Sequence, residues 1–184
     1  MIEKMKLYRR TLWGLFTAGL AFAFVTLMGQ QSLSSNQITD AEKRQKIEAM
    51  YKGYKQKFPE VQDISPREAM KLAEGGKVVF IDVRQTKEQA ISMLPGAIPD
   101  KEFLKNPDKY KDYVKIAYCT ISYRSGKFAQ KLRKDHIIVY NLQGGLLAWV
   151  HDGGKVFHNG AESNRIHVYG PKWNLGPAGY EAVW

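Results

Sequence analysis

The sequence predicts an α/β protein: a three-layer α/β/α domain built on a parallel sheet of about five strands. Short continuous apolar runs, such as residues 78–83 and 115–119, have the length and composition of buried strands. Segments with helical features separate these runs, and Gly or Pro clusters mark the boundaries between them. Because strands buried on both faces read as continuous apolar runs, this alternation is typical of a parallel sheet covered by helices on both sides.

The N-terminus predicts a membrane anchor. No charged residue occurs at positions 11–39, and an apolar run at residues 12–28 follows four basic residues. A helix over residues 11–29 would span about 28 Å, close to the thickness of the hydrocarbon layer. We therefore expect residues 1–29 to be a signal anchor, a transmembrane helix that crosses the cytoplasmic membrane once; a cleaved signal peptide is the alternative. The basic residues before the run place the rest of the chain on the periplasmic, extracytoplasmic side.

A polar tether and an amphipathic helix make up residues 30–58. The helix is expected at residues 40–57, with Asp40 as its cap. Apolar side chains recur at helical spacing along it, namely Ile47, Met50, Tyr51, Tyr54 and Phe58. This stripe predicts a helix that packs on the domain, and a helix that binds a partner is the alternative.

The domain itself is expected at residues 59–155. Its strands are predicted at residues 61–64, 78–83, 115–119 and 137–142, with one more short strand after a turn at 95–99. Its helices are predicted at residues 66–74, 87–93, 125–134 and 145–151, the first of them capped by Ser65. The remainder, residues 156–184, is rich in Gly, Pro and aromatic residues and predicts an irregular arm. We expect Trp173, Tyr180 and Trp184 to pack on the domain; a docking surface is the alternative.

Composition limits the chemistry. The chain has 184 residues, 44% of them hydrophobic, which excludes wholesale disorder and fibrous repeats. A formal net charge of +10 suits anionic substrates, an acidic partner or an anionic membrane. No nucleic-acid motif accompanies this charge, so we expect no nucleic-acid partner. Cys119 is the single cysteine and the four histidines lack ligand spacing, so we expect no disulfide, no metal and no cofactor.

Cys119 ends a predicted strand, at the sheet edge where open parallel sheets bind ligands. Residues 120–125 turn tightly from this strand into the next helix, so backbone N–H groups and the helix dipole can face the sulfur. Arg124 adds a permanent positive charge. Together these groups favour thiolate and predict that the pKa of Cys119 lies below its ordinary value of about 8.5. A buried structural cysteine is the alternative.

The loop length distinguishes two kinds of nucleophile. A cysteine in such a loop can attack a sulfane sulfur and hold it as a persulfide, or it can attack a phosphate or arsenate. Four residues separate Cys119 from Arg124, whereas loops of the tyrosine-phosphatase type have one more. A loop too short to surround a tetrahedral oxyanion favours the persulfide.

Five motifs occur in the order and spacing of a known family. They are ISPREA at residues 64–69, IDVR at 81–84, PGAI at 95–98, YCTISYRSG at 118–126 and NLQGGLLAW at 141–149. On these motifs, residues 64–156 resemble a rhodanese domain. The family usually has Gly where this chain has Ser122, and a Gly-His-Ile where it has Ser92-Met93-Leu94. A serine forced to positive φ costs energy, so the loop is expected to differ in shape from that of the family.

The resemblance implies a role for each site residue. Cys119 would carry the persulfide, and Arg124 would orient an anionic donor such as thiosulfate. Asp82 and Arg84 would support the loop side of the sheet. The persulfide would be cradled by the backbone of Thr120, Ile121, Ser122, Tyr123 and Ser125.

The sequence thus predicts a membrane-tethered sulfurtransferase that moves sulfane sulfur from thiosulfate or a persulfide donor to cyanide or a thiol, including a thiol of a partner protein. A non-catalytic binding module of the same fold is one alternative. A thiol-dependent reductase of an oxyanion or disulfide, which would need a partner thiol, is another.

One face of the helix after the loop is basic, with Lys127, Lys131 and Lys134 at helical spacing. We expect this face to be either a solvated surface or a rim that steers anions.

Overall fold

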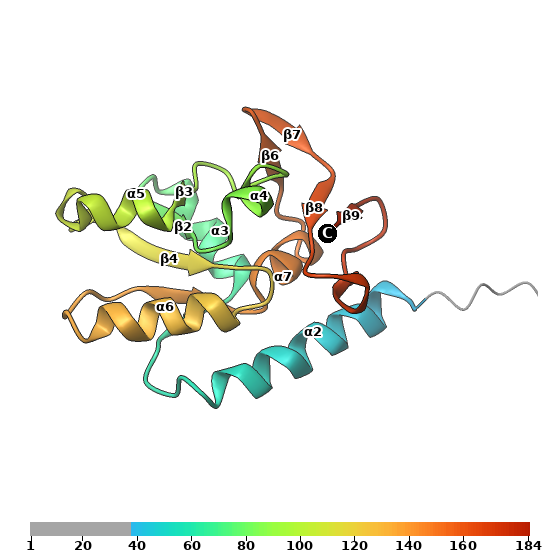
Figure 1. Cartoon of the computed structure of the whole chain (residues 1–184), viewed down its shortest axis with the longest axis horizontal. Coiled ribbons are helices and arrows are strands. Elements are labelled where there is room, and N and C mark those ends of the chain that lie inside the picture. The colour runs from blue at the N-terminus through green and yellow to red at the C-terminus, as the bar shows by residue number, and fades with distance from the viewer. Residues whose placement is uncertain (1–37) are drawn as a thin grey trace, which may run out of the picture. The chain divides into compact units, whose positions relative to one another are not determined.

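A five-stranded, wholly parallel sheet forms the centre of the computed structural model, which describes residues 38–184 (Figure 1). The strands lie in the order β1-β5-β4-β2-β3. Their bounds are β1 Asp63–Ile64, β2 Val78–Asp82, β3 Ile98–Pro99, β4 Val114–Tyr118 and β5 Tyr140–Leu142. The predicted α/β class and the five-stranded parallel sheet are therefore confirmed.

Helices cover both faces of this sheet. They are α2 Asp40–Lys55, α3 Pro66–Glu74, α4 Thr86–Gln89, α5 Asp100–Lys105, α6 Tyr123–Arg133 and α7 Gly145–His151, with short 3₁₀ helices η1 Pro107–Tyr110 and η2 Pro171–Trp173. Strand residues alternate between the two faces, because successive side chains of a strand point in opposite directions. In β2, Phe80 joins the core with α3 and α7, whereas Val79 and Ile81 join the core with α5 and α6. Two apolar cores thus make the three predicted layers.

Helix α2 lies across one side of the domain and contacts both α6 and α7. Its buried Ile47 joins the same core as α7, as the amphipathic stripe predicted. Thr39, not Asp40, caps the helix: its side chain accepts from the Glu42 amide and the Glu42 carboxylate accepts from the Thr39 amide. Asp40 is used elsewhere, because its carboxylate accepts from the amide of Ala178 in the C-terminal arm at 3.0 Å.

Several predicted boundaries are wrong. The helix predicted at 87–93 spans only Thr86–Gln89, because Met93 instead exchanges two backbone hydrogen bonds with Phe157, of 2.9 and 2.8 Å. The strand predicted at 137–142 begins only at Tyr140, where pairing with β4 begins. Helix α5, which was not predicted, buries Phe103 in the second core.

The C-terminal arm is more regular than predicted. Strands β6 Val156–His158 and β7 Ala161–Ser163 form a hairpin, and β8 Arg165–His167 pairs in parallel with β9 Glu181–Val183. These pairings join segments whose sequences show no alternation. Ile166, Val168 and Leu175 are buried, and Trp173 and Tyr180 pack against the same core, as expected for a packed arm. Trp184 differs from the expectation, since 60% of it is exposed.

The predicted membrane span, residues 11–29, lies outside the described residues, as does most of the tether. Within residues 38–184, no helix combines the length and the apolar character that crossing a bilayer requires.

Candidate active site

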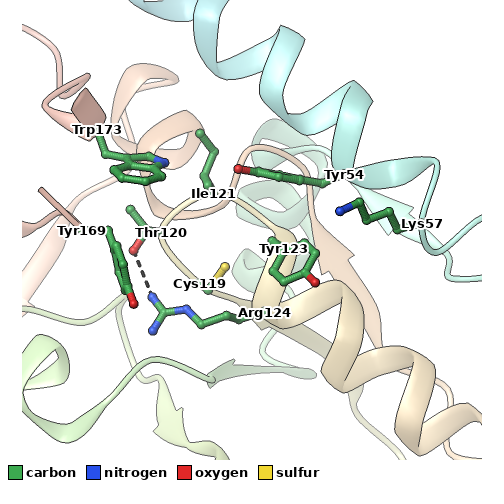
Figure 2. A pocket seen from close by; sticks show the side chains of 9 residues that line it. All are labelled: Tyr54, Lys57, Cys119, Thr120, Ile121, Tyr123, Arg124, Tyr169 and Trp173. Atoms are coloured by element: carbon green, nitrogen blue, oxygen red, sulfur yellow. Dashed lines mark hydrogen bonds between the residues drawn. The ribbon is translucent and has the colours of Figure 1, made fainter.

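Cys119 follows the last residue of β4, at the carboxyl end of the central strand. Its side chain is only 2% exposed, and the Ser125 hydroxyl donates a hydrogen bond to its sulfur over 3.7 Å. The loop that leads from Cys119 into α6 curves around the sulfur (Figure 2). The predicted position of the cysteine, between a strand end and a helix start, is the one observed.

Ser122 lies in the left-handed region, with φ 78° and ψ −14°. The loop therefore adopts a conformation that glycine would adopt more easily. The Ser122 hydroxyl donates to the carbonyl oxygen of Leu142 at 2.6 Å, which offsets the backbone cost and ties the loop to the end of β5. The serine that departs from the family thus bonds to a neighbouring strand while it occupies the glycine conformation.

The start of α7 holds the loop from behind. The amides of Leu146 and Leu147 donate to the carbonyls of Cys119 and Thr120, at 2.8 and 3.2 Å. These are helix N-terminal donors, which have no partner within their own helix. Gly145 makes the approach possible, because a Cβ there would lie 2.4 Å from the Cys119 carbonyl oxygen. The carbonyls of Cys119 and Thr120 thus bind α7, which fixes the first part of the loop.

The guanidinium of Arg124 is held by a buried carboxylate. Arg124 Nη1 donates to Glu88 Oε2 at 2.6 Å, Nη2 donates to Glu88 Oε1 at 2.8 Å, and Nη2 also reaches the Thr120 hydroxyl at 3.2 Å. Burial would by itself raise the pKa of Glu88, but the hydrogen bonds from Arg124 and from the Gln85 amide outweigh it and the pKa is lowered. The Arg124 guanidinium was predicted to orient an anionic donor, whereas in the structure it binds Glu88. Glu88 was missed; an acidic residue in the first turn of a helix was its only local signal.

Asp82 and Arg84 form a buried network below the loop. Arg84 Nε donates to Asp82 Oδ1 at 2.9 Å and Nη2 donates to Oδ2 at 2.7 Å. The Tyr118 hydroxyl donates to Asp82 Oδ2 at 2.6 Å, and Arg84 Nη2 also donates to the Ser92 carbonyl at 2.6 Å. Burial, followed by the charge of Asp82, raises the pKa of the Tyr118 hydroxyl well above its usual range. This network connects β2, β4 and the turn at residues 92–94.

A cavity of about 370 Å³ opens above Cys119. The residues of the predicted loop that line this cavity are Cys119, Thr120, Ile121, Tyr123 and Arg124. The side chains of Ser122 and Ser125 are buried beside it and do not line it. Four further residues that were not predicted to lie here come from α2, the turn after it and the C-terminal arm, namely Tyr54, Lys57, Tyr169 and Trp173. No local motif carried a signal for them, because only the packing of the arm and of α2 brings them to the loop.

Within residues 38–184, no group of three or more His, Cys, Asp or Glu side chains is arranged to hold a metal ion. The described cavity is lined by the Cys119 thiol, the Thr120 hydroxyl, the cationic side chains of Lys57 and Arg124, Ile121 and the aromatic rings of Tyr54, Tyr123, Tyr169 and Trp173.

Comparison with known proteins identifies the domain. Residues 65–152 match the family described as a rhodanese-like domain. A thiosulfate sulfurtransferase from Pseudomonas aeruginosa has a similar structure, with a TM-score of 0.51 and 21% identity over 64% of this chain and 25% of that one. This similarity shows the fold. No curated protein matches the chain.

Two further solved structures have lower scores. A rhodanese-like domain protein from Staphylococcus aureus is 30% identical over 48% of this chain and 91% of that one, with a TM-score of 0.42. A protein of unknown function from Rhodopseudomonas palustris, described as a possible tyrosine phosphatase, is 22% identical over 60% of this chain and 93% of that one, with a TM-score of 0.48. Residues 65–152 of this chain are a rhodanese-like domain.

Proposed function

We propose that the protein is a sulfurtransferase that carries sulfane sulfur as a persulfide on Cys119. The observation that carries this proposal is the position of Cys119: its sulfur lies at the carboxyl end of β4, lines the 370 Å³ cavity and accepts a hydrogen bond from Ser125. A structural cysteine needs neither a cavity nor a loop of this shape. Thiosulfate or a persulfide is the donor, and cyanide or a thiol is the acceptor.

In the first half-reaction the Cys119 thiolate attacks the sulfane sulfur of thiosulfate. A new S–S bond forms to Cys119 while the S–S bond of thiosulfate breaks, and sulfite leaves with the electron pair. The terminal sulfur of the persulfide carries the negative charge. In this proposal the N–H groups of the loop and the Ser125 hydroxyl stabilise that charge. The carbonyls of Cys119 and Thr120 are occupied by hydrogen bonds from α7.

In the second half-reaction an acceptor thiolate attacks the terminal sulfur of the persulfide. The S–S bond to Cys119 breaks, the acceptor leaves as a persulfide, and Cys119 recovers its thiolate with the electron pair. With cyanide the product is thiocyanate. The chain contains one cysteine, so no second thiol of its own can intercept the persulfide as a disulfide.

Arg124 acts in this proposal as a positioning residue. Its bidentate pairing with Glu88 joins α4 to the start of α6, and its contact with the Thr120 hydroxyl fixes the first residue of the loop. Any donor anion that reaches the guanidinium does so while Glu88 already balances its charge.

Intact-mass measurement of the full chain before and after incubation with thiosulfate tests the proposal. We expect a gain of one sulfur atom in the wild-type protein, removal of that sulfur by cyanide, and no gain in Cys119→Ser. An unchanged mass in wild-type protein whose Cys119 still reacts with iodoacetamide would favour a non-catalytic binding module. Sulfur transfer that persists in Cys119→Ser would contradict the proposal directly.

We also propose that residues 1–29 anchor the protein in the cytoplasmic membrane with the domain outside the cytoplasm. The support is the basic start followed by an uncharged apolar run. Protease added to intact spheroplasts of a bacterial host should cleave the domain. Protection until the cells are lysed would reverse this orientation.

A further inference from the structure

The walls of the cavity over Cys119 come from outside the matched domain. Tyr54 and Lys57 belong to α2 and the turn that follows it, before residue 65, whereas Tyr169 and Trp173 belong to the C-terminal arm, after residue 152. The loop that would hold the persulfide therefore forms the base of a pocket whose sides are particular to this chain.

Two aromatic pairs face this pocket. The rings of Tyr54 and Tyr123 lie with centroids 5.3 Å apart, and those of Tyr169 and Trp173 lie 5.6 Å apart at 75°. Figure 2 shows the two pairs on either side of Cys119. Tyr169 as a residue is 63% exposed, and the guanidinium carbon of Arg124 lies 5.8 Å from the centroid of its ring. Exposed rings beside a cavity offer flat apolar area to a ligand.

Positive charge lies at the rim of the same pocket. Lys57 lines the pocket, and its ammonium lies 5.3 Å from the centroid of the Tyr123 ring. Lys172 does not line the pocket, and its ammonium lies 4.1 Å from a ring of Trp173. In the part of the chain that the structure describes, neither lysine has a carboxylate within ion-pair distance. Arg124, by contrast, is already paired with Glu88. Among the described residues that line the pocket, Lys57 is therefore the charge that is free to meet an acid group.

The volume of the pocket exceeds what an inorganic ion needs. At about 370 Å³ it falls within the range of organic ligand sites. Thiosulfate and cyanide are small and fully polar, so they would leave the aromatic walls in contact with water. A ligand with a flat apolar body would cover these walls and gain from doing so.

We propose that the pocket selects an aromatic organic acid that carries the acceptor thiol, with its ring between the two aromatic pairs and its carboxylate near Lys57. Tyr169 and Trp173 are then specificity-determining residues for the second half-reaction. This inference rests on the proposed sulfurtransferase function. The chemistry of the step is unchanged: the acceptor thiolate takes the terminal sulfur, and Cys119 leaves as thiolate.

Binding without reaction tests the pocket alone. In a ligand-observed NMR titration of the full chain, we expect 4-methylbenzoate to bind and acetate not to bind. Tyr169→Ala and Trp173→Ala should each weaken 4-methylbenzoate binding about five- to tenfold. Trp184→Ala is the matched control, because Trp184 is an exposed aromatic of the same arm that does not line the pocket. Equal binding of acetate, or unchanged affinity in Tyr169→Ala, would overturn the proposal.

Turnover then tests selectivity. After loading with thiosulfate, the wild-type chain should transfer sulfur to 4-(mercaptomethyl)benzoate with a KM well below that for 3-mercaptopropionate, which carries the same charge on an aliphatic body. Tyr169→Ala should raise the first KM about fivefold and leave the second unchanged. Lys57→Gln should raise the KM of both acids but not that of uncharged benzyl mercaptan. Equal changes for all three thiols would contradict the assignment.

The two experiments separate the two claims. If Cys119 never gains sulfur while 4-methylbenzoate still binds through Tyr169, the sulfurtransferase proposal fails and the pocket stands as a binding site. If Cys119 gains sulfur and 4-methylbenzoate does not bind, the sulfurtransferase proposal stands and this inference fails.

Discussion

Glu88 and Arg124 form a bidentate ion pair beside the active-site loop, with N–O distances of 2.6 and 2.8 Å. The Glu88 side chain is buried and that of Arg124 is 29% exposed, so the pair lies at the boundary of the protein interior. Such a pair fixes the geometry of the arginine and cancels most of its charge. The arginine next to the reactive cysteine is therefore first a structural bridge between α4 and α6.

This bridge predicts the behaviour of Arg124→Lys. The lysine keeps the charge but cannot make both bonds to Glu88. We expect kcat/KM to fall about tenfold, equivalent to about 1.4 kcal/mol, for thiosulfate and for a persulfide donor with an uncharged organic substituent alike. Steady-state kinetics with both donors measures this. A loss confined to thiosulfate would contradict this prediction, because it would show that Arg124 contacts the donor directly. Glu88→Gln is the companion variant: it removes the carboxylate charge that holds the Arg124 guanidinium.

Ser122 predicts a contrast between two small substitutions. Ser122→Ala keeps the left-handed strain at φ 78° and loses the bond to the Leu142 carbonyl. Ser122→Gly loses the same bond but relieves the strain. We expect Ser122→Ala to be less stable than Ser122→Gly by about 1–2 kcal/mol in urea denaturation. The same stability in both variants would mean that the backbone at this position is not strained.

Gly145 predicts a steric effect on the loop. An alanine there would place its Cβ 2.4 Å from the Cys119 carbonyl oxygen and 2.8 Å from the Ile121 amide, both of which are backbone atoms. We expect Gly145→Ala to cost about 2–5 kcal/mol and to reduce persulfide formation, because α7 must move away from the loop. Gly153→Ala is the control: its φ is also positive, but nothing lies within 4 Å. It should cost only about 1–2 kcal/mol and leave sulfur loading intact.

His167 predicts a pH dependence of stability. Burial is the largest influence on its pKa, which lies below the ordinary 6.5 despite the nearby Glu88 carboxylate. Below pH 6.5 the unfolded chain therefore binds a proton that the folded chain does not, and the free energy of unfolding falls as the pH falls. Burial lowers the pKa of His151 in the same direction. Between pH 7 and 5.5, urea titrations of His167→Gln should show a smaller loss of stability than the wild-type protein; an unchanged slope would contradict the shift.

The basic face of α6 predicts a salt effect. Lys127, Lys131 and Lys134 line a surface hollow that also includes Arg124, so they lie beside the active-site loop. If they steer anions, replacing all three by alanine should lower kcat/KM for thiosulfate a few-fold at low salt and flatten its dependence on ionic strength. Kinetics at two salt concentrations measures this. Unchanged kinetics would leave them as a solvated face.

Local sequence patterns determined the central sheet and the reactive centre. Runs such as residues 78–83 and 115–119 encode buried strands through their own composition, and Ser65 with Glu68 encodes a capping box within one turn. Cys119 and the loop after it could be placed because a strand, a tight turn and a helix follow one another within a few residues. The strain at Ser122, whose φ is 78°, was predicted from the resemblance, because the family usually has Gly at this position.

Only the tertiary structure decided what surrounds that centre. Glu88 binds Arg124 because β2 and β4 are neighbours in the sheet, and the Gly145 turn holds the loop because β5 lies beside β4. Tyr54 and Tyr169 meet at one pocket because α2 and the C-terminal arm, distant in sequence, pack on the same side of the domain. Periodicity reports which face of an element is buried but not which element buries it. Contacts between distant segments depend on how the whole chain packs, and that is why the walls of the site could not be predicted from the sequence while its floor could.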